Sequence, residues 1–292
     1  MGRGRVQEIT FNVLMLASLV VVLASLAGIV GVVLVRGGAA LSWDMVTKPP
    51  TTGYYMGGGG GIYNAIAGSL LMAGIATVLA FGFSITVATY LQREFTRTRL
   101  ANVVRMVLEL LWGIPSIVYG IICFVIMVFF GIGTSLLAGI IALTFLEIPI
   151  MTRVMDEALT TVSTDLKASS YVLGSNRVDT AVRVVWKQAA PGITSAVLLA
   201  FGRGIGDAAS ILFTAGFTDY APKIWPPQQF FLHTLFESVA ALPTMIFFLS
   251  TSPSAEVRGR AYAGAFILLA LVLIVSAASR LLTKRLSRYI IK

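Results

Sequence analysis

Two ionisable residues, Arg203 and Asp207, stand four positions apart inside an otherwise apolar stretch of the chain. On a continuous helix they would share one face. An arginine at the centre of a bilayer costs at least about 2.5–3.5 kcal/mol, so its charge must be paired or face water. Because a guanidinium offers forked donors to an oxyanion such as phosphate, one interpretation is an anion path in which Asp207 orients and partly neutralises Arg203. The other interpretation is a structural ion pair between helices.

Glycines surround this pair. Gly202 and Gly206 have the Gly-x-x-x-Gly spacing, and Gly204 lies between them. Small residues at this spacing let two helices in a membrane approach closely. Close packing against a second subunit is the plainer interpretation, and the missing side chains also leave room for an anion beside the backbone.

Two further acids, Glu109 and Glu147, fall in or beside apolar stretches. Glu109 follows Arg105 by one helical turn, which favours a structural ion pair. Glu147 comes shortly before Pro149, and the sequence leaves three alternatives open for it. It faces an anion path, it faces a neighbouring subunit, or it meets an arginine such as Arg203.

Catalytic and metal-binding constellations are not found in the sequence. Its one cysteine, Cys123, and its one histidine, His233, exclude a disulfide, a thiolate metal site and a multi-histidine metal site. No glycine-rich phosphate loop followed by Lys and Ser or Thr occurs. The sequence therefore predicts no metal, no cofactor and no enzyme, and if the chain is driven by ATP, the nucleotide must be bound by another polypeptide.

The elements that position these residues are membrane spans. Apolar residues make up 57% of the chain and charged residues only 12%, against about 25% charged residues in soluble domains. Stretches long enough to cross a hydrocarbon core of about 30 Å predict an all-α polytopic membrane protein with six transmembrane helices. They lie near 9–35, 62–91, 106–130, 135–153, 189–217 and 261–283.

The net charge of +9 is explained by the membrane rather than by nucleic acid. Most Lys and Arg residues fall on one side of the predicted spans, and positive residues are enriched on the cytoplasmic side of membrane proteins. This asymmetry predicts that both termini lie in the cytoplasm.

One polar segment, at about 155–190, carries too many charges to lie in lipid. It reads as two short helices, with Thr164 and Asp165 as N-cap candidates and Gly174 at the break between them. An ordered helix–turn–helix on the cytoplasmic side of a membrane protein is a docking surface, and a docking surface implies a partner protein.

Two segments are expected on the opposite, external side. Residues 36–61 end in the run Gly57–Gly61, which predicts a flexible loop tip. A seventh apolar stretch, at about 228–250, contains Leu242-Pro243. If it crossed the membrane, the basic C-terminus would lie outside, so it is expected to be re-entrant or amphipathic.

Four motifs, in order along the chain, resemble those of the PstA-type permeases of phosphate ABC importers. Gly61-Ile-Tyr-Asn-Ala-Ile-Ala-Gly-Ser-Leu resembles GGIYxAIxGTL, and Glu109-Leu-Leu-Trp-Gly-Ile-Pro-Ser-Ile-Val-Tyr-Gly resembles ExxxGxPSIVYG. Gly202-Arg-Gly-Ile-Gly-Asp-Ala-Ala-Ser-Ile-Leu-Phe-Thr-Ala-Gly resembles GRAIGETAPLLFTAG, and the stretch from Leu242-Pro to Thr251-Ser-Pro resembles LPxxI…TSP. The resemblance extends from about Gly60 to the C-terminus.

The resemblance implies a type I ABC importer permease, with an anchor helix and external loop at 1–61 and a permease core at 62–292. It places Arg203, Asp207 and Glu109 on the family's substrate path. The implied partners are a sister permease (PstC-like), an ATPase dimer (PstB-like) that binds ATP and Mg²⁺, and an external phosphate-binding protein (PstS-like). The resemblance also implies contact with phosphate and with the lipid of the plasma (inner) membrane, and it implies no binding of nucleic acid.

In this family the polar segment takes the place of the coupling helices, which insert into a groove on the ATPase. Anchored on Leu173-Gly174, the family's Glu-Ala-Ala falls on Ala168, Ser169 and Ser170, so the glutamate is missing. Lys167 falls where an Arg is common, and the turn glycine, Gly174, is kept. The resemblance therefore implies that the ATPase docks here, with a groove adapted to an alanine at position 168.

Two other functions stay open. The nearer one is the same machine carrying another oxyanion, such as molybdate, tungstate or sulfate. The more distant one is a secondary anion transporter or channel, which would need no coupling element. Inverted repeats would favour a secondary transporter, and no convincing repeat is visible in the sequence.

Overall fold

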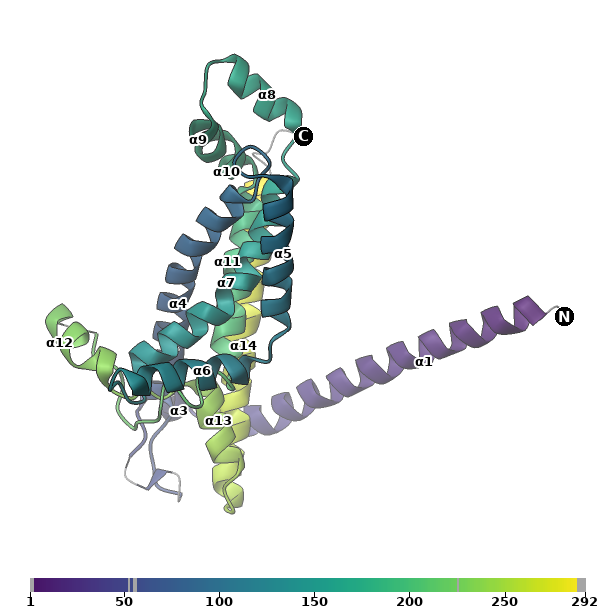
Figure 1. Cartoon of the computed structure of the whole chain (residues 1–292). Coiled ribbons are helices and arrows are strands. Elements are labelled where there is room, and N and C mark those ends of the chain that lie inside the picture. The colour runs from purple at the N-terminus through teal and green to yellow at the C-terminus, as the bar shows by residue number, and fades with distance from the viewer. Residues whose placement is uncertain (1–2, 52, 55–56, 225, 288–292) are drawn as a thin grey trace.

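The computed structural model describes residues 3–51, 53–54, 57–224 and 226–287. Within these residues the chain is helical, apart from connecting turns and one isolated antiparallel bridge between Pro50 and Gly60. The long helices run side by side as a bundle (Figure 1). The bundle includes α4 (Tyr63–Tyr90), α5 (Thr98–Gly113), α7 (Leu136–Thr160), α11 (Ala190–Gly206) and α14 (Ala255–Leu286).

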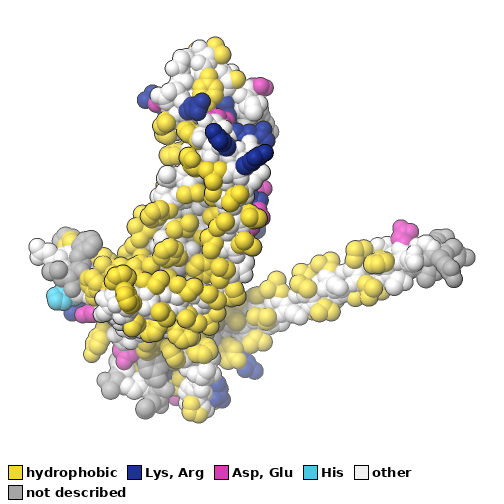
Figure 2. All heavy atoms as spheres, in the orientation of Figure 1, with side chains coloured by type: hydrophobic (Ala, Val, Ile, Leu, Met, Phe, Trp, Pro, Cys, Tyr) yellow, Lys and Arg dark blue, Asp and Glu magenta, His cyan; other side chains and the backbone are white. Residues whose placement is uncertain are grey.

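The all-α, multi-span architecture predicted from the sequence is confirmed. In the described part of the chain, 4 helices are long and apolar enough to cross a membrane, or up to 6 if each of two bent helix pairs counts as one span. Apolar side chains cover the middle of the bundle, whereas Lys and Arg gather at the end that carries α8 (Thr164–Val172), as Figure 2 shows. This distribution fits a bundle whose middle lies in lipid.

The third predicted span, 106–130, corresponds to a bent pair of helices. α5 begins earlier, at Thr98, and the chain bends by 95° before α6 (Ser116–Phe129). Pro115 has no backbone N–H and disfavours helical backbone in the residue before it, so Ile114 is extended, with φ −70° and ψ 130°. The bend was not predicted because apolar side chains continue across it.

The fifth predicted span, 189–217, is too long, because α11 ends at Gly206. Asp207 is extended, with φ −80° and ψ 114°. Its Oδ2 accepts hydrogen bonds from the backbone N–H of Ser210, at 2.9 Å, and from the Ser210 hydroxyl, and so begins the turns that follow. Helix formation is weak here because each glycine near the end of α11 costs about 1 kcal/mol relative to alanine.

The boundary between the fourth predicted span and the polar segment also moves. The span was expected at 135–153, but α7 continues to Thr160. Residues 155–160, predicted as the start of the polar segment, therefore form the last turns of α7. Buried small residues of α4, including Ala76 and Ala80, belong to the same apolar clusters as α7 residues, and such residues let helices in a membrane pack closely.

The loop before α4 is folded against the bundle, contrary to the expected flexible tip. It includes the short helix α3 (Trp43–Thr47). Arg260 of α14 donates hydrogen bonds to the carbonyl oxygens of Tyr54 (2.7 Å), Gly57 (3.2 Å) and Gly58 (2.7 Å). At Gly60, φ is +108° and a Cβ would lie 2.7 Å from neighbouring backbone atoms, so glycine is required. The glycine-rich stretch is thus part of an ordered loop around the guanidinium of Arg260.

The first helix, α1 (Arg3–Val32), projects away from the bundle (Figure 1). None of its most apolar stretch is buried in the chain. The helix continues through a π-helical turn, η1 (Val33–Gly37), and α2 (Gly38–Ala40). At Gly37 the chain packs against Tyr262 of α14 so closely that a Cβ would lie 2.5 Å from its carbonyl oxygen. The apolar surface of α1 is therefore left for lipid or for another protein.

The segment expected to be re-entrant or amphipathic is divided into short helices, none of them long enough to cross a membrane. They are α12 (Pro227–Leu232), a 3-10 turn η4 (Thr234–Phe236) and α13 (Leu242–Ser250). α13 is 9 residues long, which corresponds to about 14 Å. Its residues Leu242, Met245 and Leu249 are buried in the same cluster as Tyr54 and Val257. This segment and the loop before α4 share one apolar core.

Candidate functional site: a projecting helical segment and polar groups in the membrane

Beyond α7 the chain forms a projection at one end of the bundle, here called the α8–α10 segment, residues 164–188 (Figure 1). It comprises α8, α9 (Arg177–Asp179), a π-helical turn η3 (Thr180–Val185) and α10 (Trp186–Gln188). The segment leads at once into α11, with a bend of 73°. A displacement of the projection is therefore passed to α11 without an intervening linker.

The local sequence explains the two helices of the segment. The N-cap of α8 is Ser163, whose hydroxyl accepts a hydrogen bond from the N–H of Asp165, so the predicted caps Thr164 and Asp165 are wrong by one or two positions. Asn176 caps α9 by accepting from the N–H of Asp179 at 2.8 Å. Gly174 has φ +87°, which confirms the predicted glycine turn between them.

The predicted coupling residues fall on two faces of α8. Ala168 and Ser169 are exposed, whereas Lys167 and Ser170 are buried. The hydroxyl of Ser170 lies 3.0 Å from that of Thr180 and joins α8 to η3. Ser170 therefore holds the segment together, Lys167 faces inward, and Ala168 and Ser169 are the ones available to a partner.

Large apolar side chains that the sequence reasoning passed over form the tip of the projection. Val172 and Leu173 are each 86% exposed, and Val178 on the neighbouring turn is 62% exposed. Such side chains on an otherwise polar projection mark a protein interaction surface. Val172 and Leu173 directly precede the turn glycine Gly174, and this position in the sequence could have indicated that they lie at the tip.

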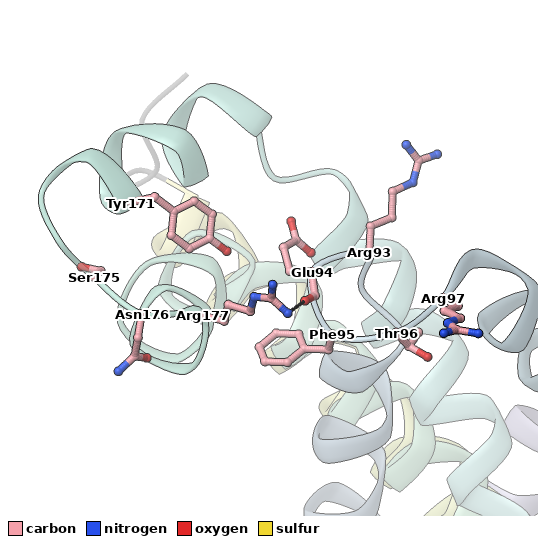
Figure 3. A pocket seen from close by; sticks show the side chains of 9 residues that line it. All are labelled: Arg93, Glu94, Phe95, Thr96, Arg97, Tyr171, Ser175, Asn176 and Arg177. Atoms are coloured by element: carbon pink, nitrogen blue, oxygen red, sulfur yellow. Dashed lines mark hydrogen bonds between the residues drawn. The ribbon is translucent and has the colours of Figure 1, made fainter.

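The inner face of the segment is attached to the turn between α4 and α5, residues 91–97. Lys167 forms a salt bridge with Glu94 at 3.0 Å, and Arg177 donates to the Glu94 carbonyl oxygen at 3.0 Å. Trp186 donates to the hydroxyl of Thr89 at 2.9 Å. An open cavity of about 710 Å³ lies over this contact, with Tyr171 on its α8 side (Figure 3).

The Glu94 carboxylate is held in its charged form by this contact. Partial burial alone would raise its pKa, but the hydrogen bond from Lys167, with the charges of Lys167 and Arg93, holds the pKa below the ordinary glutamate value.

The acid at the end of α7, Asp156, fixes the same turn to the bundle. It accepts two hydrogen bonds from Arg105 of α5, at 2.6 and 3.0 Å, and one from Gln92 at 3.0 Å. Arg105 is thus occupied, and the expected pair with Glu109 is wrong: Glu109 lies 3.1 Å from Arg153 of α7. The pairing differs because residues brought close by packing on α7 offer better geometry than the next turn of α5.

The predicted pair of Arg203 and Asp207 is also not formed, because Asp207 lies past the end of α11 and accepts from Ser210. Arg203 is exposed, and among the described residues no salt bridge includes it. A guanidinium near the end of a membrane helix that its own chain does not pair is free to meet an anion or another subunit. Its role in a substrate path stays a prediction.

Glu147 is buried inside the bundle rather than facing outward or meeting Arg203. Its side chain is fully inaccessible, and its Oε2 accepts a hydrogen bond from Thr77 of α4 at 2.9 Å. Its Oε1 has no hydrogen-bond partner among the described residues and lies against Gly204 of α11. The acid therefore sits where α4, α7 and α11 meet.

This contact assigns the helix-packing role within the chain to Gly204 rather than to its neighbours. A Cβ on Gly204 would overlap the Glu147 carboxyl, whereas a Cβ on Gly202 meets only Val275 at 3.8 Å and one on Gly206 meets nothing within 4 Å. The predicted packing of Gly202 and Gly206 against a sister subunit is not tested by the single chain.

The described residues hold no group of three or more His, Cys, Asp or Glu side chains that could bind a metal ion. What the arrangement offers is mechanical and electrostatic: an exposed docking tip, a charged attachment to the α4–α5 turn, and an unpaired arginine on the helix that continues the projection.

Comparison with known proteins identifies relatives of the chain. A family model described as binding-protein-dependent transport system inner membrane component matches residues 82–288. The phosphate transport system permease protein PstA of Yersinia pestis is 33% identical over 237 residues, which cover 81% of this chain and 75% of that protein. The PstA protein of Haemophilus influenzae is 30% identical over 276 residues, 93% of each chain.

The fold is similar to that in the crystal structure of a bacterial alginate ABC transporter in complex with an alginate pentasaccharide-bound periplasmic protein. The TM-score is 0.62 at 15% identity, over 95% of this chain and 96% of that one. Since the family model covers most of the sequence and relatives above 30% identity match along most of their length, the chain belongs to the family of binding-protein-dependent transport system inner membrane components, as a non-catalytic, multi-pass permease subunit.

Proposed function

We propose that the chain is the transmembrane permease subunit of an ATP-driven phosphate importer. The observation that carries the proposal is the α8–α10 segment, an ordered projection with Val172 and Leu173 exposed at its tip. A transporter that powers itself has no use for such a surface, whereas a permease driven by a separate ATPase requires one. Phosphate as the cargo is supported by the names of the relatives.

The proposed partners follow from the surfaces that the chain leaves open. An ATPase dimer, which binds ATP and Mg²⁺, docks on the α8–α10 segment in the cytoplasm, where both termini of the chain also lie. A homologous sister permease completes the translocation path and covers the exposed α1. An external phosphate-binding protein docks at the opposite end, near the loop before α4 and α13.

The proposed mechanism is alternating access. Closure of the ATPase dimer moves the α8–α10 segment, and the direct connection to α11 carries this movement to Arg203. Arg203 then meets the phosphate dianion with forked donors, and no carboxylate of its own chain competes for it in the described structure. Since Asp207 and Glu109 have other partners, Arg203 is the residue of this chain best placed to contact the anion.

The test is anion uptake into proteoliposomes that contain the assembled complex and its binding protein. Phosphate, sulfate and molybdate are compared, with and without ATP on the side that faces the ATPase. Phosphate uptake that requires ATP supports the proposal. ATP-dependent uptake of sulfate or molybdate in its place retains the machine and replaces the cargo, and uptake that is indifferent to ATP rejects the importer.

A further inference from the structure

Glu94, in the turn between α4 and α5, contacts both helices of the docking projection with two different groups. Its carboxylate binds Lys167 on α8, and its backbone carbonyl accepts from Arg177 on α9. In Figure 3, Arg177 and Tyr171 approach the turn from the projection, and the Arg177 guanidinium reaches the backbone oxygen of Glu94. One residue thus bridges the hairpin of α8 and α9 to the bundle.

We propose that Glu94 is a positioning residue that clasps the α8–α10 segment to the α4–α5 turn, so that a push on the docking tip reaches α4, α5 and α7 as well as α11. This inference rests on the proposed function, because it concerns the transmission of ATPase movement. It assigns a role to Lys167 that differs from contact with the ATPase.

The partial burial of the ion pair strengthens the clasp. The side chain of Lys167 is 11% exposed and that of Glu94 24% exposed. Exposed ion pairs contribute little because water competes with them, whereas removing one partner of a buried pair leaves the other charge without compensation. The low pKa of the Glu94 carboxyl agrees with a pair that is kept charged.

The turn that carries Glu94 is itself fixed, so it can transmit force. Gln92 is 6% exposed and donates to the Ala88 carbonyl oxygen at 3.2 Å and to Asp156 at 3.0 Å. Arg105 of α5 donates to the Leu91 carbonyl oxygen at 3.2 Å and also binds Asp156 of α7. The turn is therefore joined to three helices of the bundle, α4, α5 and α7.

The segment is attached to the bundle in two ways, by the chain itself, which enters from α7 and continues into α11, and by side-chain contacts with Glu94 and Thr89. Its connection to α11 is covalent and continuous, and it acts at one end of the segment. The Glu94 contacts act near the middle, where α8 and α9 meet, and they consist of charges and hydrogen bonds. With the clasp intact, the segment moves together with the α4–α5 turn. Without it, the segment is held by its chain connections to α7 and α11 and by the hydrogen bond from Trp186 to Thr89, and it moves apart from the turn more readily.

The test uses the assembled complex with Glu94→Gln, Lys167→Gln and the exchanged pair Glu94→Lys/Lys167→Glu. Two quantities are measured: hydrogen exchange of the backbone of residues 164–188, and the number of phosphate ions transported per ATP hydrolysed. Each single variant is expected to raise exchange about tenfold, as for a local opening that loses an ion pair, and to lower the transport ratio several-fold. The exchanged pair is expected to restore both.

The matched control is Glu157→Gln. Glu157 and Glu94 line the same cavity of about 730 Å³. Glu157 is exposed, however, and forms no salt bridge among the described residues. It removes an equal charge from the same place and is expected to leave both quantities unchanged.

The outcomes separate the clasp from the function on which it rests. If the native complex imports phosphate with ATP but the single variants keep native exchange and native coupling, the clasp is rejected and the importer stands. If exchange rises without a change in the transport ratio, or if the exchanged pair fails to restore the ratio, Glu94 does not position the segment for coupling. If the native complex does not import phosphate, the function fails, and the exchange measurement still decides whether the contact holds the segment.

Discussion

At the scale of single residues, the least expected feature is a carboxylic acid fully enclosed by three membrane helices. Glu147 has one hydrogen bond, from Thr77, and its other oxygen rests against the backbone of Gly204. An ionised carboxylate with so few partners is costly in a dry interior. The contact therefore depends on a glycine that leaves space on α11 and on a threonine that donates from α4.

Replacing Gly204 by Ala is expected to destabilise the chain by about 1–3 kcal/mol, because the new methyl group overlaps the Glu147 carboxyl. The measurement is thermal unfolding in detergent. Gly206→Ala is the matched control, since a Cβ there meets nothing within 4 Å. Equal stability of the two variants would contradict the close contact between α7 and α11.

Replacing Arg203 by Gln is expected to abolish anion uptake while leaving the assembly of the complex intact, because the guanidinium has no salt bridge in the described chain. Uptake and the composition of the purified complex are measured together. Near-native uptake would show that Arg203 is dispensable for transport.

The salt bridge of Glu94 makes a pH prediction. Its pKa is lower in the folded chain than the ordinary value of 4.5, so the stabilisation is present above that value and is lost as the pH falls through the folded pKa. The α8–α10 segment is expected to loosen in this acidic range, and the fluorescence of Trp186 reports it. In Lys167→Gln the acidic change should be absent, and an identical profile in both proteins would contradict the assignment.

At the scale of elements, breaks and bends determine where the helices end and in which direction the chain continues. The breaks at Pro115 and after Gly206 interrupt two predicted spans, and the chain bends by 95° between α5 and α6. The turn at Gly174 has the opposite effect: it folds α8 back on α9 and brings Leu173 to the tip. Each break has a local cause in glycine or proline.

Gly174→Glu is expected to uncouple ATP hydrolysis from transport. A side chain at φ +87° strains the turn, and the new charge lies beside the exposed docking tip. Gly174→Asn tests the cause, since asparagine tolerates this backbone conformation better. The ratio of phosphate transported to ATP hydrolysed is measured for both. If the glutamate variant keeps native coupling, the docking surface lies elsewhere.

Part of this organisation could be predicted from the sequence. Long apolar stretches identify α4 and α14 because their length has no other common explanation, and Gly174 identifies its turn. The ion pairs could not be predicted: Lys167 and Glu94 are 73 residues apart, and Arg105 binds an acid 51 residues away rather than the one on the next turn. Spacing in the sequence shows which residues are neighbours on one helix. The ion pairs between helices depend on how the helices pack, which the spacing does not show.

At the scale of the whole molecule, the chain leaves the apolar surface of one long helix uncovered. α1 extends away from the bundle with its most apolar stretch unburied. In a bilayer this surface is in contact with lipid or with a second protein.

Removing residues 1–32 is expected to leave the thermal stability of the remaining chain nearly unchanged, because the bundle contacts begin at η1. The same deletion is expected to weaken association with the sister permease. Stability is measured in detergent, and association by co-purification with full-length chain as the control. A large loss of stability would show that α1 belongs to the core of its own chain.

The loop held by Arg260 has a consequence for the opposite end of the molecule. Three backbone carbonyls, the ring of Tyr54 and the carboxylate of Glu256 surround one guanidinium. The external binding protein proposed to dock at this face would meet a shape that is already set. Because the glycine-rich loop is already ordered in the folded chain, the entropy cost of ordering it does not lower the affinity for the binding protein.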